Sequence, residues 1–265
     1  PQPNLERRER GGMRPILLKG HERALTCVIY NREGDLIFTA AKDHIPVVWY
    51  ADSGERVGTY VGHQGAVWEL SVSWDSKYLL SASADATARL WEVETGETLA
   101  IYSHNGPVRS VCWAEGGEKF ASASDPFVKQ PGYISVFSTP RGADPTQFDT
   151  LPVMKIEQIG KIRVSKVLWG AMNEYLIVGY DDGSIVLYDA VDGSELMRRA
   201  VHAGAVNRLY LNKDKTLLLS CSKDYTAKLL NAKTLEEIKN YQTDRPVNAA
   251  VIHPTKEHIL LGGGQ

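Results

Sequence analysis

Apolar residues recur along this chain in blocks of about 42 residues, and within each block they alternate with polar residues. Histidine marks the start of successive blocks at His21, His63 and His104, which lie 42 and 41 residues apart, and again at His202. The gap of 98 residues before His202 fits one further copy with Gly160 in the histidine position. A sixth copy would begin near residue 243. A fixed period of this length is the signature of a repeat architecture.

Each block predicts four short strands, here called a to d. Apolar residues at positions +7 and +9 after the marker, such as Leu70 and Val72, have the spacing of a strand that buries one face. An apolar and then small run follows, as in residues 79–83, and a third strand ends at an aromatic or large apolar residue. In the third copy that residue is Phe137, displaced by six extra residues. No long apolar stripe with a helical period competes, so the chain is expected to be all-β.

Polar residues recur with the same period, and we interpret them as a structural hydrogen-bond network. An acid stands about 22 residues after each marker, beside a Ser or Thr on strand b and a Trp on strand c. The members are His21, Thr39, Asp43 and Trp49; His63, Ser81, Ser83, Asp85 and Trp91; His104 and Asp125; His202 and Asp224. The alternative is a Ser-His-Asp hydrolase. Because an enzyme rarely needs one equivalent triad per repeat, no catalytic residue is expected.

Composition narrows the function classes. The 265 residues contain 30 Lys and Arg against 32 Asp and Glu, a net charge of −2 that gives little support to DNA binding. No apolar run approaches the length of a membrane span, and residues 1–12 lack the apolar core of a signal peptide. Cys27, Cys112 and Cys221 are expected to be buried free thiols, and His253 and His258 lack a third metal ligand. We therefore expect a cytoplasmic protein without cofactor, metal or membrane.

Two surface features are candidates for contacts with other proteins. The third copy carries insertions at residues 126–132 and 139–152, which are either functional loops or tolerated additions. In the fifth copy the a–b turn at 212–215 and the c–d turn at 231–233 are expected to lie together. The residues predicted to contact a partner there are Asp214, Lys215, Asn231 and Lys233. An ordinary solvated charged face is the alternative.

The repeats resemble a known family. Gly20-His21 with Trp49-Tyr50, and Gly62-His63 with Trp91-Glu92, resemble the WD-repeat β-propellers. The likeness extends further, to the WD-repeat "i" subunits of eukaryotic translation initiation factor three. The segments that carry it are residues 13–23, 30–35, 58–63, 245–248 and 261–265.

The resemblance implies a fold of seven blades, in which a strand near residues 15–19 closes the ring as the outer strand of the last blade. Residues 13–265 then form about five and a half blades plus that closing strand, and residues 1–12 are expected to be a flexible extension. Because the sixth copy stops inside a presumed hairpin, we expect roughly 60–80 further residues in the natural protein.

The resemblance also implies a function and partners. It predicts a non-catalytic scaffold of initiation factor three, which docks the C-terminal segment of the "b" subunit and binds the "g" subunit. Contact with the small ribosomal subunit pre-initiation complex would be mostly indirect. The same repeats would also suit another cytoplasmic WD-repeat adaptor, such as a scaffold associated with a kinase receptor.

Overall fold

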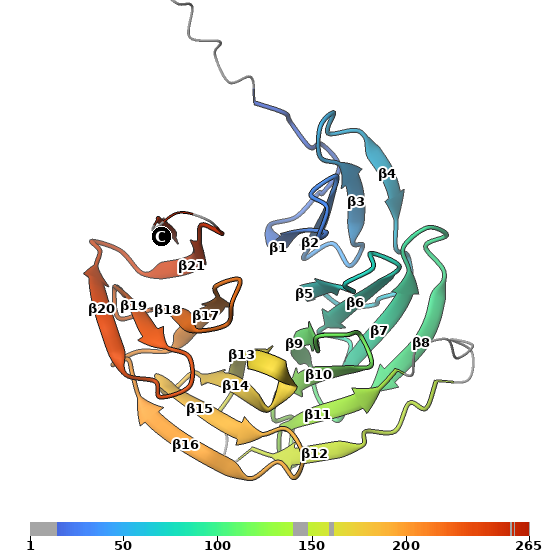
Figure 1. The fold of residues 1–265 in the computed structure, drawn as a ribbon. Helices are drawn as coiled ribbons and strands as arrows, with labels where there is room; N and C mark the ends of the chain where they lie inside the picture. The colour runs from blue at the N-terminus through green and yellow to red at the C-terminus, as the bar shows by residue number, and fades with distance from the viewer. Residues whose placement is uncertain (1–14, 140–147, 159–161, 255, 257, 265) are drawn as a thin grey trace, which may run out of the picture.

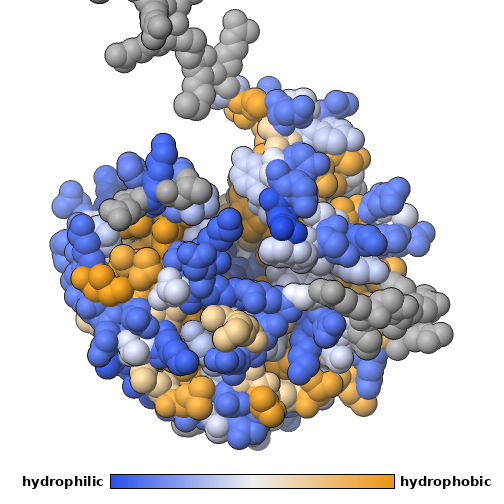
Figure 2. Space-filling view, viewed as in Figure 1, coloured by the Kyte–Doolittle hydropathy of each residue, from blue (hydrophilic) through white to orange (hydrophobic). Residues whose placement is uncertain are grey.

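The computed structural model describes residues 15–139, 148–158, 162–254, 256 and 258–264. In these residues the strands form five antiparallel sheets of four strands and one sheet of two, arranged radially around an axis (Figure 1). The prediction of an all-β propeller built on the 42-residue repeat is therefore confirmed. Figures 1 and 2 show the ring open between β1 and β21.

The strands follow the chain from the axis outward in each blade, and the blades are numbered in chain order. Blade 1 consists of β1 (Leu25–Tyr30), β2 (Leu36–Ala41), β3 (Val47–Tyr50) and β4 (Arg56–Thr59), and blade 2 of β5 (Val67–Val72), β6 (Tyr78–Ser83), β7 (Thr87–Glu92) and β8 (Thr98–Ser103). Blade 3 consists of β9 (Val108–Trp113), β10 (Lys119–Ser124), β11 (Tyr133–Ser138) and β12 (Met154–Glu157), and blade 4 of β13 (Val164–Trp169), β14 (Tyr175–Tyr180), β15 (Ser184–Asp189) and β16 (Glu195–Ala200). Blade 5 consists of β17 (Val206–Leu211), β18 (Leu217–Ser222), β19 (Thr226–Asn231) and β20 (Glu237–Gln242), and the two-stranded sheet of β21 (Val247–Ile252) and β22 (Ile259–Gly263). A 3-10 turn, η2 (Ala171–Asn173), lies in the a–b turn of blade 4.

The hydrophobic core lies between the blades. Phe38 and Val48 of blade 1, for example, pack in one cluster with Leu79 and Trp91 of blade 2. The second strands carry small, buried residues, as in the Ser81-Ala82-Ser83 run of β6, whereas the residues of outer strands such as β16 are mostly exposed. Polar residues cover most of the face seen in Figure 2. Burial between neighbouring sheets explains why each blade needs the next for stability.

Each innermost strand of the complete blades carries a β-bulge near its start. The pairing with the second strand skips Thr26, Trp68, Arg109, Ser165 and Asn207 in blades 1 to 5. A bulge leaves its extra residue out of the ladder and re-aims its side chain. The five side chains are thereby released from the sheets at equivalent places around the axis.

Some predicted features are not tested by the structure or fall outside it. Residues 15–19 are not assigned to a strand, and Ile16 and Leu18 pack over Gly54. The closing role of this segment in the last blade stays a prediction. The extension 1–12, the fourth marker Gly160 and residues 140–147 of the second insertion lie outside the described residues. Cys27 and Cys221 are buried free thiols as predicted, and Cys112 is partly buried.

Candidate functional site

The repeated polar residues form hydrogen-bonded chains in blades 1 and 2. In blade 2, His63 Nδ1 lies 2.8 Å from Asp85 Oδ2 and His63 Nε2 lies 2.6 Å from Ser81 Oγ. Trp91 Nε1 donates to the same Ser81 oxygen at 2.8 Å. Blade 1 repeats this chain with His21, Asp43, Thr39 and Trp49 in the corresponding places. The structure therefore brings these predicted residues together.

Blade 5 has a shorter version of the chain. His202 contacts Asp224 at 3.0 Å and Ser220 at 2.8 Å. Leu230 stands where blade 2 has Trp91, so the serine receives no indole hydrogen bond.

Ser83 of blade 2 is not a member of the hydrogen-bonded chain of that blade. Its hydroxyl donates to Gly65 O and accepts from Asp85 N, which fixes the b–c turn.

These chains have the order of a catalytic triad, but their environment is that of a structural network. Burial opposes ionisation of Asp85, yet the hydrogen bonds from His63, Thr87 and the Gln64 amide outweigh it and hold the pKa of Asp85 well below its usual range. The carboxylate then orients the imidazole, whose Nε2 accepts from Ser81. Ser81 is fully buried, and both its donor and its acceptor capacity are occupied. A serine in this setting stabilises the blade by satisfying two neighbours.

Blade 3 differs from the prediction. Asp125 was expected in a network with His104, but it pairs with Arg109, with Arg109 Nε 2.7 Å from Asp125 Oδ2. His104 instead uses Tyr102 O, 2.9 Å from its Nδ1, and Ser122 Oγ, 2.7 Å from its Nε2. The reason is spacing: Asp125 follows its marker by 21 residues, one fewer than Asp85, and so occupies the turn position that Ala84 has in blade 2.

The buried His104 makes stability depend on pH in a defined window. Burial lowers the pKa of His104 to about 4, against 6.5 for the ordinary side chain. The unfolded chain therefore binds a proton between these values while the folded chain does not, so stability falls as pH falls. We expect His104 to account for a loss of about 2 kcal/mol between pH 7 and pH 5. Urea unfolding of the parent and of His104→Gln at both pH values measures this difference, and parallel pH profiles for the two proteins would contradict it.

The predicted contact residues of blade 5 lie together, since Ala232 N of the c–d turn donates to Thr216 O beside the a–b turn at 2.9 Å. Asp214 and Lys233 are exposed. Lys215 and Asn231 are engaged within the fold: Lys215 Nζ contacts Glu115 Oε1 at 2.9 Å, and Asn231 Oδ1 accepts from Lys233 N at 2.9 Å. These two residues therefore position the turns, and Asp214 and Lys233 face solvent.

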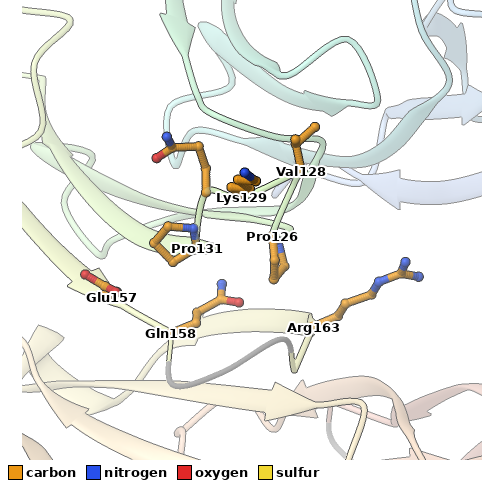
Figure 3. Close-up of a pocket in the computed structure, with 8 residues that line it drawn as sticks. Pro126, Val128, Lys129, Pro131, Glu157, Gln158 and Arg163 are labelled. Carbon is orange, nitrogen blue, oxygen red and sulfur yellow. The ribbon is translucent and has the colours of Figure 1, made fainter.

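The first insertion of blade 3 forms one wall of a cavity. Pro126 and Pro131 lie across from Glu157 and Gln158 around a volume of about 430 Å³ (Figure 3). Gln158 is buried, and its amide donates to Ser124 O at 3.0 Å, which ties the end of β12 to the start of the insertion. The insertion is thus anchored at its base.

An ion cluster on the propeller axis was missed by the sequence reasoning. Glu69 of β5 is only 2% exposed, and its carboxylate accepts from Arg208 Nη1 of β17 at 2.6 Å and from Ser110 Oγ of β9 at 2.5 Å. Lys166 of β13 also bonds to it. Arg208 further donates to Thr26 O of β1 at 2.9 Å. One carboxylate and its partners thereby join the innermost strands of five blades.

Among the described residues, no group of His, Cys, Asp and Glu side chains could hold a metal ion. No helix in that part of the chain is long and apolar enough to cross a membrane.

A family model and similar known proteins all name the same family. A model of the EIF3I family matches residues 13–265. The chain is 44% identical over 254 residues to "Eukaryotic translation initiation factor 3 subunit I" of Homo sapiens, a match that covers 96% of this chain and 77% of the human protein. The Mus musculus protein of the same name matches equally. That of Drosophila grimshawi is 41% identical over 254 residues, with the same two coverages.

Proposed function

The chain belongs to the family of eukaryotic translation initiation factor 3 subunit I, and we propose that it acts there as a non-catalytic scaffold in the cytoplasm. Family membership supports a role in translation initiation. In the proposed role the propeller docks other subunits of the factor, the C-terminal segment of "b" and the "g" subunit, during assembly on the small ribosomal subunit and during scanning.

The observation that carries the scaffold role is the rigid display of turns on one face. The a–b turns of blades 3 and 4 are joined by Asn173, whose side chain bonds Glu115 N and O at 2.8 and 2.9 Å. Lys215 links the a–b turn of blade 5 to the same neighbours through Glu115 and Gly170 O. A surface held in this way needs little reordering when a partner binds, which lowers the cost of association.

Within this face the proposed contact residues for the "b" segment are Asp214 and Lys233. Both are exposed, and neither side chain forms an ion pair with another described residue. Charges at the rim of an interface steer association and set specificity. Lys215 and Asn231 are proposed to support the contact by fixing the turns.

Affinity capture of the full chain from eukaryotic cytosol tests this proposal. We expect recovery of initiation factor subunits and small-subunit proteins, reduced about tenfold by Asp214→Lys with Lys233→Glu because two rim charges are reversed. Asp52→Lys with Lys77→Glu is the matched control, since it reverses an exposed acid and an exposed lysine in the c–d and a–b turns of blades 1 and 2.

Each outcome of the capture is informative. An equal loss in both double variants would refute the blade 5 contact. Recovery of signalling kinases without ribosomal proteins would favour an adaptor outside translation and would refute the scaffold role proposed here.

A further inference from the structure

A cavity of about 410 Å³ opens at one end of the propeller axis, and its walls are the bulged starts of the innermost strands. The side chains that each bulge releases from the sheet in blades 1 to 5 all line it: Thr26, Trp68, Arg109, Ser165 and Asn207. The first residues of three b–c turns, Asp125, Asp181 and Lys223, complete the rim. The cavity is therefore built by the repeat geometry, on the face opposite the blade 5 contact.

Positive charge is in excess in this cavity. Arg109, Arg163, Arg208 and Lys223 line it against only two carboxylates, Asp125 and Asp181. Arg109 forms an ion pair with Asp125. Arg208 forms an ion pair with the buried Glu69, which also pairs with Lys166. Low-dielectric walls focus the field of such an excess into the concavity.

Two of the cations are available for a ligand. The side chains of Arg163 and Lys223 form no ion pair with another described residue, and both are exposed. Both line the cavity together with Asp181, on whose carboxylate their charges act. A single Asp181 carboxylate leaves one of the two charges uncompensated, and a second carboxylate between them would complete the pairing.

The walls also hold an unused hydrogen-bond donor and an unused acceptor. Trp68 Nε1 and Asp125 Oδ1 are buried and have no hydrogen-bond partner among the described residues. Asp125 is only 4% exposed, so its free oxygen is a costly group to leave unpaired. Both atoms are shielded from solvent, so they belong to the inside of the wall and are not counted as ligand contacts.

The aromatic content of the cavity argues against nucleic acid. Single-stranded nucleic acid is bound by a track of cations with open rings on which bases stack. Trp68 is the aromatic residue of the lining, and the Arg109 guanidinium covers its ring at 4.5 Å. The cations converge on one concavity of a size that holds one or two side chains, which suits a carboxylate side chain.

We propose that this cavity, the axial-mouth site, docks an acidic segment of a partner protein, with one carboxylate held between Arg163 and Lys223. It goes beyond the scaffold role above, because it assigns a second surface on the other face. The two are separable: reversing the charges of one face leaves the other unchanged.

Fluorescence anisotropy with fluorescein-labelled hexaglutamate, at low ionic strength to limit screening, tests the axial-mouth site on the full chain. Saturable binding is expected, weakened about tenfold or more by Arg163→Glu with Lys223→Glu. Lys77→Glu with Lys119→Glu is the matched control, two exposed cations on the opposite face, and it should bind as the parent does. Circular dichroism confirms that each exposed-residue variant is folded.

Three results would overturn the proposal. They are no saturable binding of hexaglutamate, equal weakening in the matched control, and tighter binding of a labelled hexauridylate that the Arg163→Glu, Lys223→Glu variant abolishes. The last result would assign the site to RNA. The Arg163→Glu, Lys223→Glu variant is also used in the capture experiment described above. If it still recovers initiation factor subunits, the blade 5 contact is intact, so a failure of the axial-mouth site is distinguishable from a failure of that contact.

Discussion

Glu69→Ala is expected to lower the free energy of unfolding by about 3–5 kcal/mol, the cost of removing one partner from a buried ion cluster. Burial alone would raise the pKa of Glu69, but the charges of Lys166 and Arg208 outweigh it and keep the group ionised. Without the carboxylate, the two cations face each other in the axis with no counter-charge. The expected loss of stability therefore comes mainly from two buried cations whose desolvation is no longer compensated, and only in smaller part from the lost contact itself.

A second glutamate–arginine pair provides the control for this experiment. Glu195 and Arg198 bond at 2.8 Å on the outer strand β16, with side chains 36% and 33% exposed. Glu195→Ala should cost about 0–1 kcal/mol, as surface pairs do. Urea unfolding of both variants measures the contrast, and Glu69→Gln, which keeps hydrogen-bonding atoms, should fall between them. Equal costs for Glu69→Ala and Glu195→Ala would contradict the assigned role of the axial cluster.

The axial cluster is the part of the structure that was not predicted from the sequence, although its members occupy equivalent positions in the repeats. Its members stand six residues after their markers in copies two to five, as Glu69, Ser110, Lys166 and Arg208. The position is repeated but the residue type is not, because opposite charges from different blades complement one another across the axis. A search for shared residue types passes over such a position. A search for polar residues at equivalent places in an apolar strand would have found it.

The repeat itself was predictable because its physical causes are local. Alternating burial sets the strands, and a fixed offset from marker to acid and to Trp sets the network within one blade. Asp125 was misplaced because its offset is one residue short, which moves it from the His104 network to Arg109. The axial-mouth site could not be predicted from one repeat, since the bulged side chains of five blades meet there only when the blades are arranged around the axis.

Ser81→Ala is expected to cost about 2–4 kcal/mol, because it leaves two buried partners unsatisfied. Ser81 Oγ lies 2.6 Å from His63 Nε2 and accepts from Trp91 Nε1 at 2.8 Å, in a fully buried position. Neither ring can reach water when the hydroxyl is lost. The measurement is the change in unfolding free energy by urea titration at pH 7, where the imidazole of the unfolded chain is mostly neutral.

Blade 3 offers a matched substitution that isolates the indole contribution. Ser122 bonds His104 Nε2 at 2.7 Å, but the strand-c residue there is Phe137, which has no donor. Ser122→Ala should therefore cost about 1–2 kcal/mol, the value of one orphaned buried group, and the difference from Ser81→Ala gives the Trp91 hydrogen bond. Equal costs for the two serines would mean that the Trp91 bond contributes nothing. The repeated Trp would then act through its buried ring alone.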